Sequence, residues 1–341
     1  MRRRLLRTCS GVILGPLLTA CGGSGVGPSG TPTPTPQVVT NPVTFIAFFD
    51  ENENGTPESN EGTRIPGVEL VAGSARGTTA VLTGQAILQV PAGSQTLTVT
   101  AASLPPFYRP PAAPIQITSP ATGQIMVPIT LPRGSNRANV YMAFGDSITK
   151  GEPEVGDGNG YRRTLEGLLR AHFGSAEIAD RGRDATSTDD GADLIGRDLG
   201  NIQPSFVLIH YGTNDWNDLR CREIEACTVT TSNLRFIVQQ INRTRSHAFL
   251  ATIIPSNTGY DNRAPESRNE WVAAQNAAIK RLAEEEGAVL VDLNDAFLKS
   301  GRSLPTLFVD HVHPTAVGYD IMAQTWFSAI TKAYSKILST P

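Results

Sequence analysis

Val140-Tyr141-Met142-Ala143-Phe144 runs directly into Gly145-Asp146-Ser147-Ile148-Thr149. The first five residues are apolar and favour β structure, so we expect a buried strand that ends at Gly145. In α/β proteins with a parallel sheet, functional groups gather just beyond the carboxyl ends of the strands. This stretch therefore predicts such a sheet, with Ser147 placed at the end of one of its strands.

Strands and helices alternate through the rest of this region. Further strands are predicted at 206–210, 248–254 and 288–293, and helices at 161–173, 234–241, 270–286 and 316–337. Such alternation favours a parallel sheet covered by helices on both faces. We therefore predict a three-layer α/β domain over residues 138–338.

Two more polar segments accompany Ser147 in this domain. Gly212-Thr213-Asn214-Asp215 follows a predicted strand, and Asp310-His311-Val312-His313-Pro314 lies near the C-terminus. The three segments together supply a hydroxyl, an amide donor and an acid–histidine pair, which are the parts of a serine hydrolase. Each alone is a weak signal, because a serine or asparagine after a strand is more often a turn former. Their co-occurrence favours a catalytic site.

In content and order these segments resemble the blocks of the GDSL/SGNH hydrolase superfamily, over about residues 139–337. The resemblance implies that Ser147 is the nucleophile and that its backbone N–H and the Asn214 amide donate to the oxyanion. It also implies that His313 is the general base and Asp310 its orienting partner, with no cofactor for catalysis. His311 competes for the base role, but the family spacing Asp-x-x-His assigns that role to His313.

The second block departs from the family pattern. Its usual glycine donates a backbone N–H to the oxyanion, whereas this chain reads Asp180-Arg181-Gly182-Arg183-Asp184-Ala185-Thr186-Ser187. By spacing Ala185 matches that glycine, and Gly182 is the alternative. A backbone donor survives the change from glycine to alanine if φ is negative. Arg183 and Asp184 are expected either to shape the pocket or to pair with each other.

Within the superfamily the chain is most similar to the acetyl xylan and sugar-ester branch. Gly160-Tyr161-Arg162, His313-Pro314 and Gly318-Tyr319 carry that likeness, and the polar Trp216-Asn217-Asp218 suits a sugar better than an acyl chain. The expected substrate is an ester on acetylated polysaccharide or oligosaccharide. Three alternatives stay open: a lysophospholipase or thioesterase of the same fold, a non-catalytic surface carbohydrate-binding protein, and a calcium-stiffened adhesin whose functional part is the β-rich N-terminal region.

The N-terminus reads as an export segment. Four arginines precede a short apolar run, and Leu18-Thr19-Ala20-Cys21 resembles a bacterial lipobox. We predict a signal peptide at 1–20, lipidation of Cys21 and an extended Pro/Thr/Gly-rich tether at 21–42. The protein would then be extracytoplasmic and anchored by its lipid to a bacterial membrane. A secretory signal cleaved near Ala20 is the alternative.

The remaining cysteines predict a disulfide, and the net charge limits the class of binding partner. In an oxidising compartment Cys221 and Cys227, which lie close together in one loop, are expected to form a small disulfide. The net charge of -3 argues against broad electrostatic binding to nucleic acid.

Residues 43–133 differ from both flanking regions. Short β-like runs at 43–49, 68–71, 86–90, 96–100 and 124–129, punctuated by glycine and proline, predict a small β-sandwich. The segment 50–61 satisfies the template of a calcium loop and resembles the loop of surface-protein B-type sandwich repeats. The expected structural calcium ligands are Asp50, Asn52, Asn54, Thr56, Glu58 and Glu61. A solvated acidic turn is the alternative.

Overall fold

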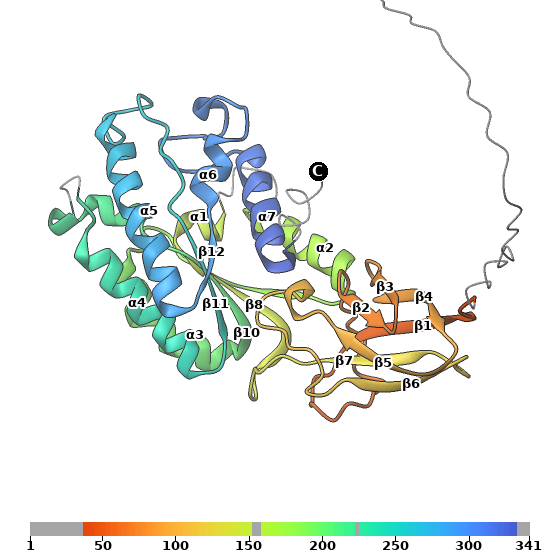
Figure 1. Cartoon of the computed structure of the whole chain (residues 1–341). Helices are drawn as coiled ribbons and strands as arrows, with labels where there is room; N and C mark the ends of the chain where they lie inside the picture. The colour runs from red at the N-terminus through yellow and green to blue at the C-terminus, as the bar shows by residue number, and fades with distance from the viewer. Residues whose placement is uncertain (1–36, 152–157, 222–224, 333–341) are drawn as a thin grey trace, which may run out of the picture. The chain divides into compact units, whose positions relative to one another are not determined.

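The computed structural model describes residues 37–151, 158–221 and 225–332 (Figure 1). The predicted signal peptide, Cys21 and most of the predicted tether lie outside these residues, so they stay predictions. Among these described residues, those from Val39 onward form one compact unit. Among the helices that are described, none has the length and apolar character needed to span a membrane.

A β-sandwich forms the N-terminal part of this unit, as predicted. One sheet has the strand order β4-β1-β7 and the other the order β3-β2-β5-β6. The strands are β1 (Thr40–Phe49), β2 (Glu69–Ala72), β3 (Ala75–Thr78), β4 (Gln85–Pro91), β5 (Gly93–Val99), β6 (Ile115–Ser119) and β7 (Ile125–Ile129). The sequence did not predict β3, because its four residues include no apolar side chain larger than alanine and none is buried.

A five-stranded parallel sheet, in the order β12-β11-β10-β8-β9, is the centre of the C-terminal part. Its strands are β8 (Arg137–Gly145), β9 (Glu177–Gly182), β10 (Pro204–His210), β11 (His247–Ala251) and β12 (Val289–Val291). From β8 the chain builds outward to β9 on one side and to β10 on the other. The crevice at such a reversal of strand order lies at the carboxyl ends of β8 and β10. The segments that carry Ser147 and Asn214 begin there.

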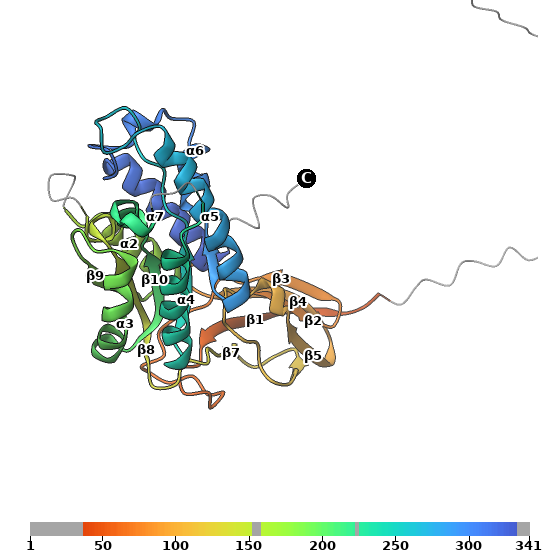
Figure 2. The same ribbon diagram turned by 90° about the vertical axis from the view of Figure 1, so that its left-hand side faces the viewer.

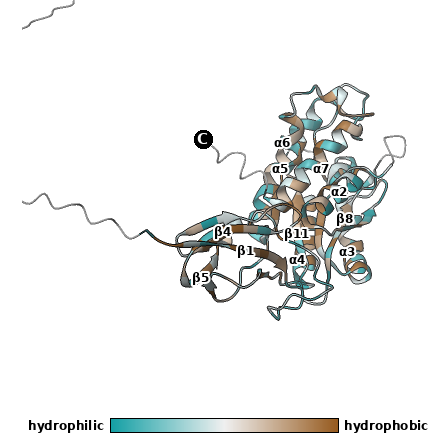
Figure 3. Ribbon diagram, turned by 90° about the vertical axis from the view of Figure 1, so that its right-hand side faces the viewer, coloured by the Kyte–Doolittle hydropathy of each residue, from teal (hydrophilic) through white to brown (hydrophobic). Residues whose placement is uncertain are grey.

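Helices cover both faces of this sheet, which confirms the predicted fold class (Figures 1 and 2). One face packs on α2 (Arg162–Phe173), α6 (Leu293–Leu298) and α7 (Ala316–Thr331). The other packs on α3 (Thr188–Ile202), α4 (Thr228–Arg243) and α5 (Ser267–Glu286). Alternate residues of β8 serve the two faces, because side chains of a strand point to opposite sides in turn. In Figure 3 the hydrophobic colour accordingly concentrates on the strands between the helices.

Several predicted boundaries were wrong. The strand predicted at 248–254 ends at Ala251, and the strand predicted at 288–293 covers only Val289–Val291, because Leu293 begins α6. Neither β9 nor α3 was predicted. Strand β9 is nowhere fully buried, and α3 contains three glycines, which weaken its helical pattern.

The sandwich packs against the amino ends of the parallel strands. The Phe107 ring stacks on His247, the first residue of β11, with 4.4 Å between ring centroids. The Tyr108 ring lies 6.3 Å from that of Phe206, near the start of β10. A single buried apolar cluster joins the sandwich interior to the sheet face under α2, α6 and α7. The division into residues 43–133 and 138–338 stays a prediction, since the two regions share this core.

Candidate active site

Ser147 is the first residue of α1 (Ser147–Lys150), a single helical turn directly after β8. The buried Asp146 carboxylate caps this turn by accepting a hydrogen bond from the Ile148 N–H at 2.9 Å. Gly145 is required at the bend, because a Cβ there would lie 2.4 Å from the His210 carbonyl oxygen. The close approach of β8 and β10 and the cap together fix the position of Ser147.

Ser147, His313 and Asp310 form a hydrogen-bonded series. Ser147 Oγ is 2.8 Å from His313 Nε2, and His313 Nδ1 is 2.8 Å from Asp310 Oδ2. The backbone N–H groups of Val312 and His313 both donate to Asp310 Oδ1 at 2.7 Å. The structure thus brings together the three residues that the sequence singled out as a catalytic group.

The protonation states follow from these contacts. Burial opposes ionisation of Asp310, but the hydrogen bonds from His313 and Val312 outweigh it and hold the pKa of Asp310 well below its usual range. An ionised carboxylate can only accept, so the proton of a neutral His313 lies on Nδ1. His313 Nε2 is then the acceptor that faces the Ser147 hydroxyl.

Asn214 and Asp215 fasten the turn after β10 to the segment after β9. The Asn214 amide donates one hydrogen bond to the Thr186 carbonyl at 2.9 Å, which leaves its second N–H. The buried Asp215 carboxylate accepts from the Thr188 N–H at 2.9 Å and from the hydroxyls of Thr188 and Thr230, both at 2.6 Å. Asp215 therefore has a structural role: its hydrogen bonds reach other segments and do not close a local turn.

The two candidates for the second-block donor differ in their hydrogen bonds. The Gly182 N–H is already committed to Asp180 Oδ1 at 2.8 Å. The Ala185 N–H has no partner among the described residues, and Ala185 is exposed. Its φ is +57°, so the negative φ that the sequence argument required is wrong. Ala185 adopts the left-handed conformation that glycine favours, as a residue standing in for a glycine would.

Arg183 and Asp184 do not pair with each other. Arg183 Nη2 is 2.6 Å from Asp198 Oδ2, and Asp184 forms an ion pair with Lys150. The backbone N–H of Arg183 donates to the Gly145 carbonyl at 3.0 Å, which ties the second block to the strand that carries Ser147. Asp198 gave no signal in the sequence, because it lies in an unpredicted helix.

The two other histidines near these strand ends stay outside the series. His311 Nδ1 is 3.8 Å from Asp310 Oδ2 and has no hydrogen-bond partner in the described part of the chain, so His313 and not His311 reaches Ser147. His210 is buried. Neither of its ring nitrogens has a partner among the described residues. Burial lowers the pKa of His210 to about 4.

An aromatic pair and a buried arginine stand next to Asn214. Trp216 is half-buried and packs edge-on against Trp271, with 5.6 Å between centroids. Arg268 Cζ lies 5.9 Å from the Trp216 ring centroid, and its Nη2 donates to the Thr213 carbonyl at 3.2 Å. Burial lowers the pKa of Arg268 to about 10. The sequence contains no motif that would identify Arg268, since it comes from α5, far along the chain.

The predicted disulfide between Cys221 and Cys227 is present, with 5.0 Å between the two Cα atoms. The Trp271 indole N–H donates to the Cys221 carbonyl at 2.6 Å, and Gln275 Oε1 accepts from the Cys227 N–H at 2.8 Å. The bridge and these bonds anchor the loop after Asn214 to α5.

The predicted calcium loop forms a tight acidic turn after β1. Each carboxylate oxygen of the buried Asp50 and Glu61 accepts a backbone N–H bond from within the loop, at 2.8 to 3.2 Å. The Asn52 and Asn54 amides donate to Glu58 at 2.6 and 2.7 Å. No three His, Cys, Asp or Glu residues of the described chain are grouped closely enough to hold a metal ion. In this geometry the loop holds itself together and does not present a ligand cage, so calcium stays a prediction.

Comparison with known proteins places residues 143–321 in the sequence model of the GDSL-like Lipase/Acylhydrolase family. A GDSL-like lipase from Bacteroides thetaiotaomicron is 21% identical, with 57% of this chain and 89% of that chain covered and a TM-score of 0.45. A catalytic mutant of an acetylxylan esterase from Geobacillus stearothermophilus is 21% identical, with 57% and 95% covered and a TM-score of 0.47. No curated protein matches the chain significantly.

Proposed function

The chain belongs to the GDSL-like lipase/acylhydrolase family of ester hydrolases, and on this premise we propose that it is an exported serine esterase that removes O-acetyl groups from carbohydrate. The observation that carries the catalytic part is the hydrogen-bonded series from Ser147 through His313 to Asp310. A degenerate, non-catalytic domain would have no reason to retain both 2.8 Å contacts in this order.

In the first half-reaction Ser147 Oγ attacks the ester carbonyl carbon while His313 Nε2 accepts the hydroxyl proton. Asp310 stabilises the imidazolium that forms and keeps the ring in place. His313 then gives this proton to the departing sugar oxygen, and the acetyl group stays on Ser147. General base catalysis of this kind typically contributes about 10²–10⁴-fold to the rate.

In the second half-reaction His313 Nε2 takes a proton from water, and the resulting hydroxide adds to the acetyl carbonyl. Collapse of this intermediate breaks the bond to Ser147 Oγ, which recovers its proton from His313. Acetate leaves, and the enzyme returns to its starting state. The same three residues serve both halves because proton acceptance and donation alternate at one nitrogen.

Three donors are assigned to the oxyanion of both steps: the Ser147 N–H, the second N–H of the Asn214 amide and the Ala185 N–H. The hydrogen bond from Asn214 to Thr186 supports this assignment, because it holds the amide to the segment that contains Ala185. Losing one such donor typically lowers kcat by about 10²–10³.

The carbohydrate part of the proposal is supported by Trp216. Its half-buried indole stands two residues after Asn214 and is held by Trp271 and Arg268. A fixed aromatic face beside a reaction centre suits the apolar face of a sugar ring. The N-terminal arginines, the Cys21 lipobox and the Cys221–Cys227 bridge support export and lipid anchoring.

Parallel assays of wild type and Ser147→Ala test the proposal. We expect acetate release from p-nitrophenyl acetate and from acetylated xylan, and a loss of about 10⁴-fold or more in the variant with its melting temperature unchanged. The rate should fall from acetyl to butyryl to octanoyl esters. A rate that rises with acyl length would favour the lysophospholipase or thioesterase alternative. Folded wild-type protein that cleaves none of these esters would refute the esterase.

A further inference from the structure

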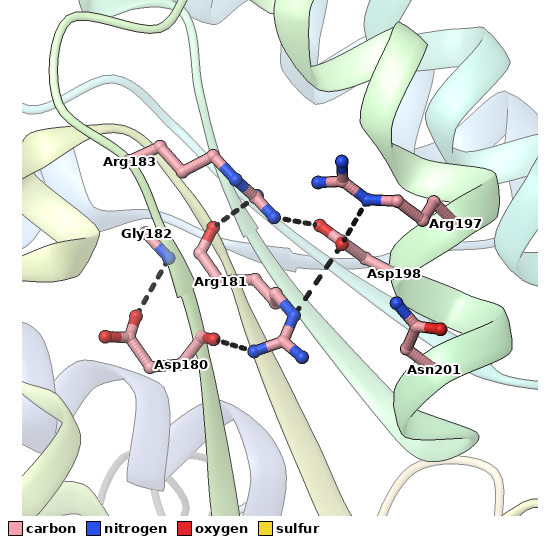
Figure 4. A pocket seen from close by; sticks show the side chains of 7 residues that line it. All are labelled: Asp180, Arg181, Gly182, Arg183, Arg197, Asp198 and Asn201. Atoms are coloured by element: carbon pink, nitrogen blue, oxygen red, sulfur yellow. Dashed lines mark hydrogen bonds and ion pairs between the residues drawn. The ribbon is translucent and has the colours of Figure 1, made fainter.

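A basic hollow lies between the edge strand β9 and helix α3 (Figure 4). Its volume is about 370 Å³. It is lined by Asp180, Arg181, Gly182, Arg183, Arg197, Asp198 and Asn201. The hydrolysis mechanism uses none of these side chains, so catalysis does not explain why three arginines lie together here.

The three arginines share one buried carboxylate. Asp198 is 1% exposed, and its Oδ2 lies 2.6 Å from Arg183 Nη2. Its Oδ1 lies 3.6 Å from Arg181 Nε and 3.4 Å from Arg197 Nε. One negative charge therefore faces three positive charges, and the cluster has an excess of two positive charges.

Asp180 does not remove this excess. In Figure 4 its carboxylate points away from the three guanidinium groups, where it accepts the Gly182 N–H. Its Oδ2 is also 3.2 Å from Arg162 Nη1, so Asp180 is matched by a fourth arginine on the other side of β9. Like charges held close together are unfavourable unless an anion joins them.

The guanidinium groups also keep unused donors. Each carries five N–H groups, arranged as a planar fork that matches a carboxylate. Arg197 donates only through Nε, to Asp198, among the contacts of the described chain, and its side chain is 59% exposed. Arg181 Nη1 donates to the Asp180 carbonyl at 2.5 Å, and its Nη2 has no partner in the described residues. These exposed donors are the kind that recognise an oxyanion group.

The hollow is connected to the proposed active site but lies some distance from it. The Arg183 N–H donates to the carbonyl of Gly145, two residues before Ser147. Asp198, however, lies ten residues beyond the first residue of α3, which is about 15 Å along a helix at 1.5 Å per residue. A single substrate could therefore place an acetyl group at Ser147 and an anion in the hollow only if it is an extended molecule.

We propose that this hollow binds a sugar carboxylate on the chain that carries the ester, so that the substrate class is an acetylated acidic polysaccharide. The inference rests on the proposed function for the identity of the chain, but the anion site itself does not. Carboxylate is the group that the hollow already accommodates, as the Arg183–Asp198 contact demonstrates. Arg181, Arg183 and Arg197 are then specificity-determining residues for the polymer.

The test compares substrates for wild type and Arg197→Gln, because Arg197 is exposed and outside the catalytic machinery. For acetylated glucuronoxylan we expect KM to rise about five- to tenfold, as for the loss of one charge-assisted contact, with kcat unchanged. The kinetics on carboxyl-reduced, neutral polymer and on p-nitrophenyl acetate should not change. Arg76→Gln on β3, which removes an arginine that is 72% exposed, is the matched control and should leave every KM unchanged.

If the cluster has a purely structural role, Arg197→Gln should lower the melting temperature. The ratio of the KM for acidic polymer to the KM for neutral polymer should then stay at its wild-type value. That outcome would overturn the inference.

A binding measurement separates this inference from the proposed function. Calorimetry of Ser147→Ala with an oligoglucuronate should show binding that weakens as salt is added and weakens about five- to tenfold further with Arg197→Gln. Binding of this kind without any ester cleavage by wild type would uphold the hollow and refute the esterase. Ester cleavage by wild type without oligoglucuronate binding would uphold the esterase and refute the anion site in the hollow. Inorganic phosphate that binds while the oligoglucuronate does not would overturn the assignment to a carboxylate.

Discussion

The two ends of the parallel sheet have different surroundings, apolar at the amino ends of the strands and polar at the carboxyl ends. At the amino ends, the rings of Phe107 and Tyr108 pack on His247 and Phe206, and the sheet and sandwich share an apolar core. At the carboxyl ends, the neighbours are carboxylates, imidazoles and amides. Several of their buried atoms, including Asp146 Oδ2 and both His210 ring nitrogens, have no partner in the described chain.

The difference shows where stability and chemistry are located. Burial raises the pKa of Asp146 to about 7, beside Ser147, so the carboxyl end holds a cap that is only partly ionised at neutral pH. Unpaired buried polar groups are unfavourable. The packing at the amino ends contributes no reactive group, and we infer that it offsets this instability. Changes at the two ends should therefore separate activity from stability.

The largest effect is expected for Asp310→Asn at the carboxyl end. The neutral amide cannot stabilise the imidazolium and favours the wrong His313 tautomer, so kcat should fall by about 10⁴. His311→Gln, which changes a neighbour outside the hydrogen-bonded series, should alter kcat less than threefold. Steady-state kinetics on p-nitrophenyl acetate measure kcat of both variants. Equal losses of kcat would mean that His311 also takes part in catalysis.

At the amino end, Phe107→Ala should lower the free energy of unfolding by about 2–3 kcal/mol, since it removes a half-buried ring from two aromatic contacts. We expect kcat of the folded variant to stay within twofold of wild type. Urea denaturation measures the first quantity, and Phe107→Leu should show a smaller loss. A fall in kcat parallel to the loss of stability would show that the two ends are coupled.

Acid should lower the stability contributed at both ends of the sheet, through the buried His210 and the half-buried His247. Burial lowers the pKa of His210 and of His247 to about 4, from 6.5. Because each folded-state pKa is depressed, the stability is fully present above pH 6.5 and is lost as the pH falls toward 4. The loss is about 3 kcal/mol for each histidine.

Melting temperatures of wild type, His210→Gln and His247→Gln between pH 7 and pH 4 test this. Each variant should have a flatter profile, and the double variant the flattest. Since the histidines lie at opposite ends of the sheet, the two effects should add. An unchanged slope in both single variants would mean that other groups control the acid transition.

The smallest effect is expected for Ala185→Gly. Glycine adopts the observed φ of +57° without the penalty that alanine has, but it loses more entropy on folding, so stability should change by less than about 1 kcal/mol. The backbone N–H is retained, and activity should stay within twofold. Ala185→Val should lower both, because a β-branched residue tolerates this φ poorly. Full activity in the valine variant would show that the backbone conformation at this position does not limit catalysis.

Sequence reasoning recovered the residues that local spacing defines. Ser147, Asn214, Asp310 and His313 each lie in a short block, and strand periodicity placed two of those blocks at strand ends. The sequence could not predict the backbone conformation at individual positions, as the positive φ of Ala185 shows. The sequence also could not predict contacts made by segments that lack a hydrophobic pattern or a motif. Asp198 belongs to a glycine-rich helix, and Arg268 contacts Thr213, which is 55 positions away in the chain.

Strand β9 is an edge of the parallel sheet, and this has a consequence for how the protein behaves in concentrated solution. An edge strand exposes unpaired backbone groups that can recruit another β-strand, and charged side chains oppose this. Arg181 and Asp180 on β9, with Arg183 just beyond it, place charge along that edge. Neutralising the strand arginines would thus promote self-association, whereas Arg197 on α3 can be replaced while the edge keeps its charges.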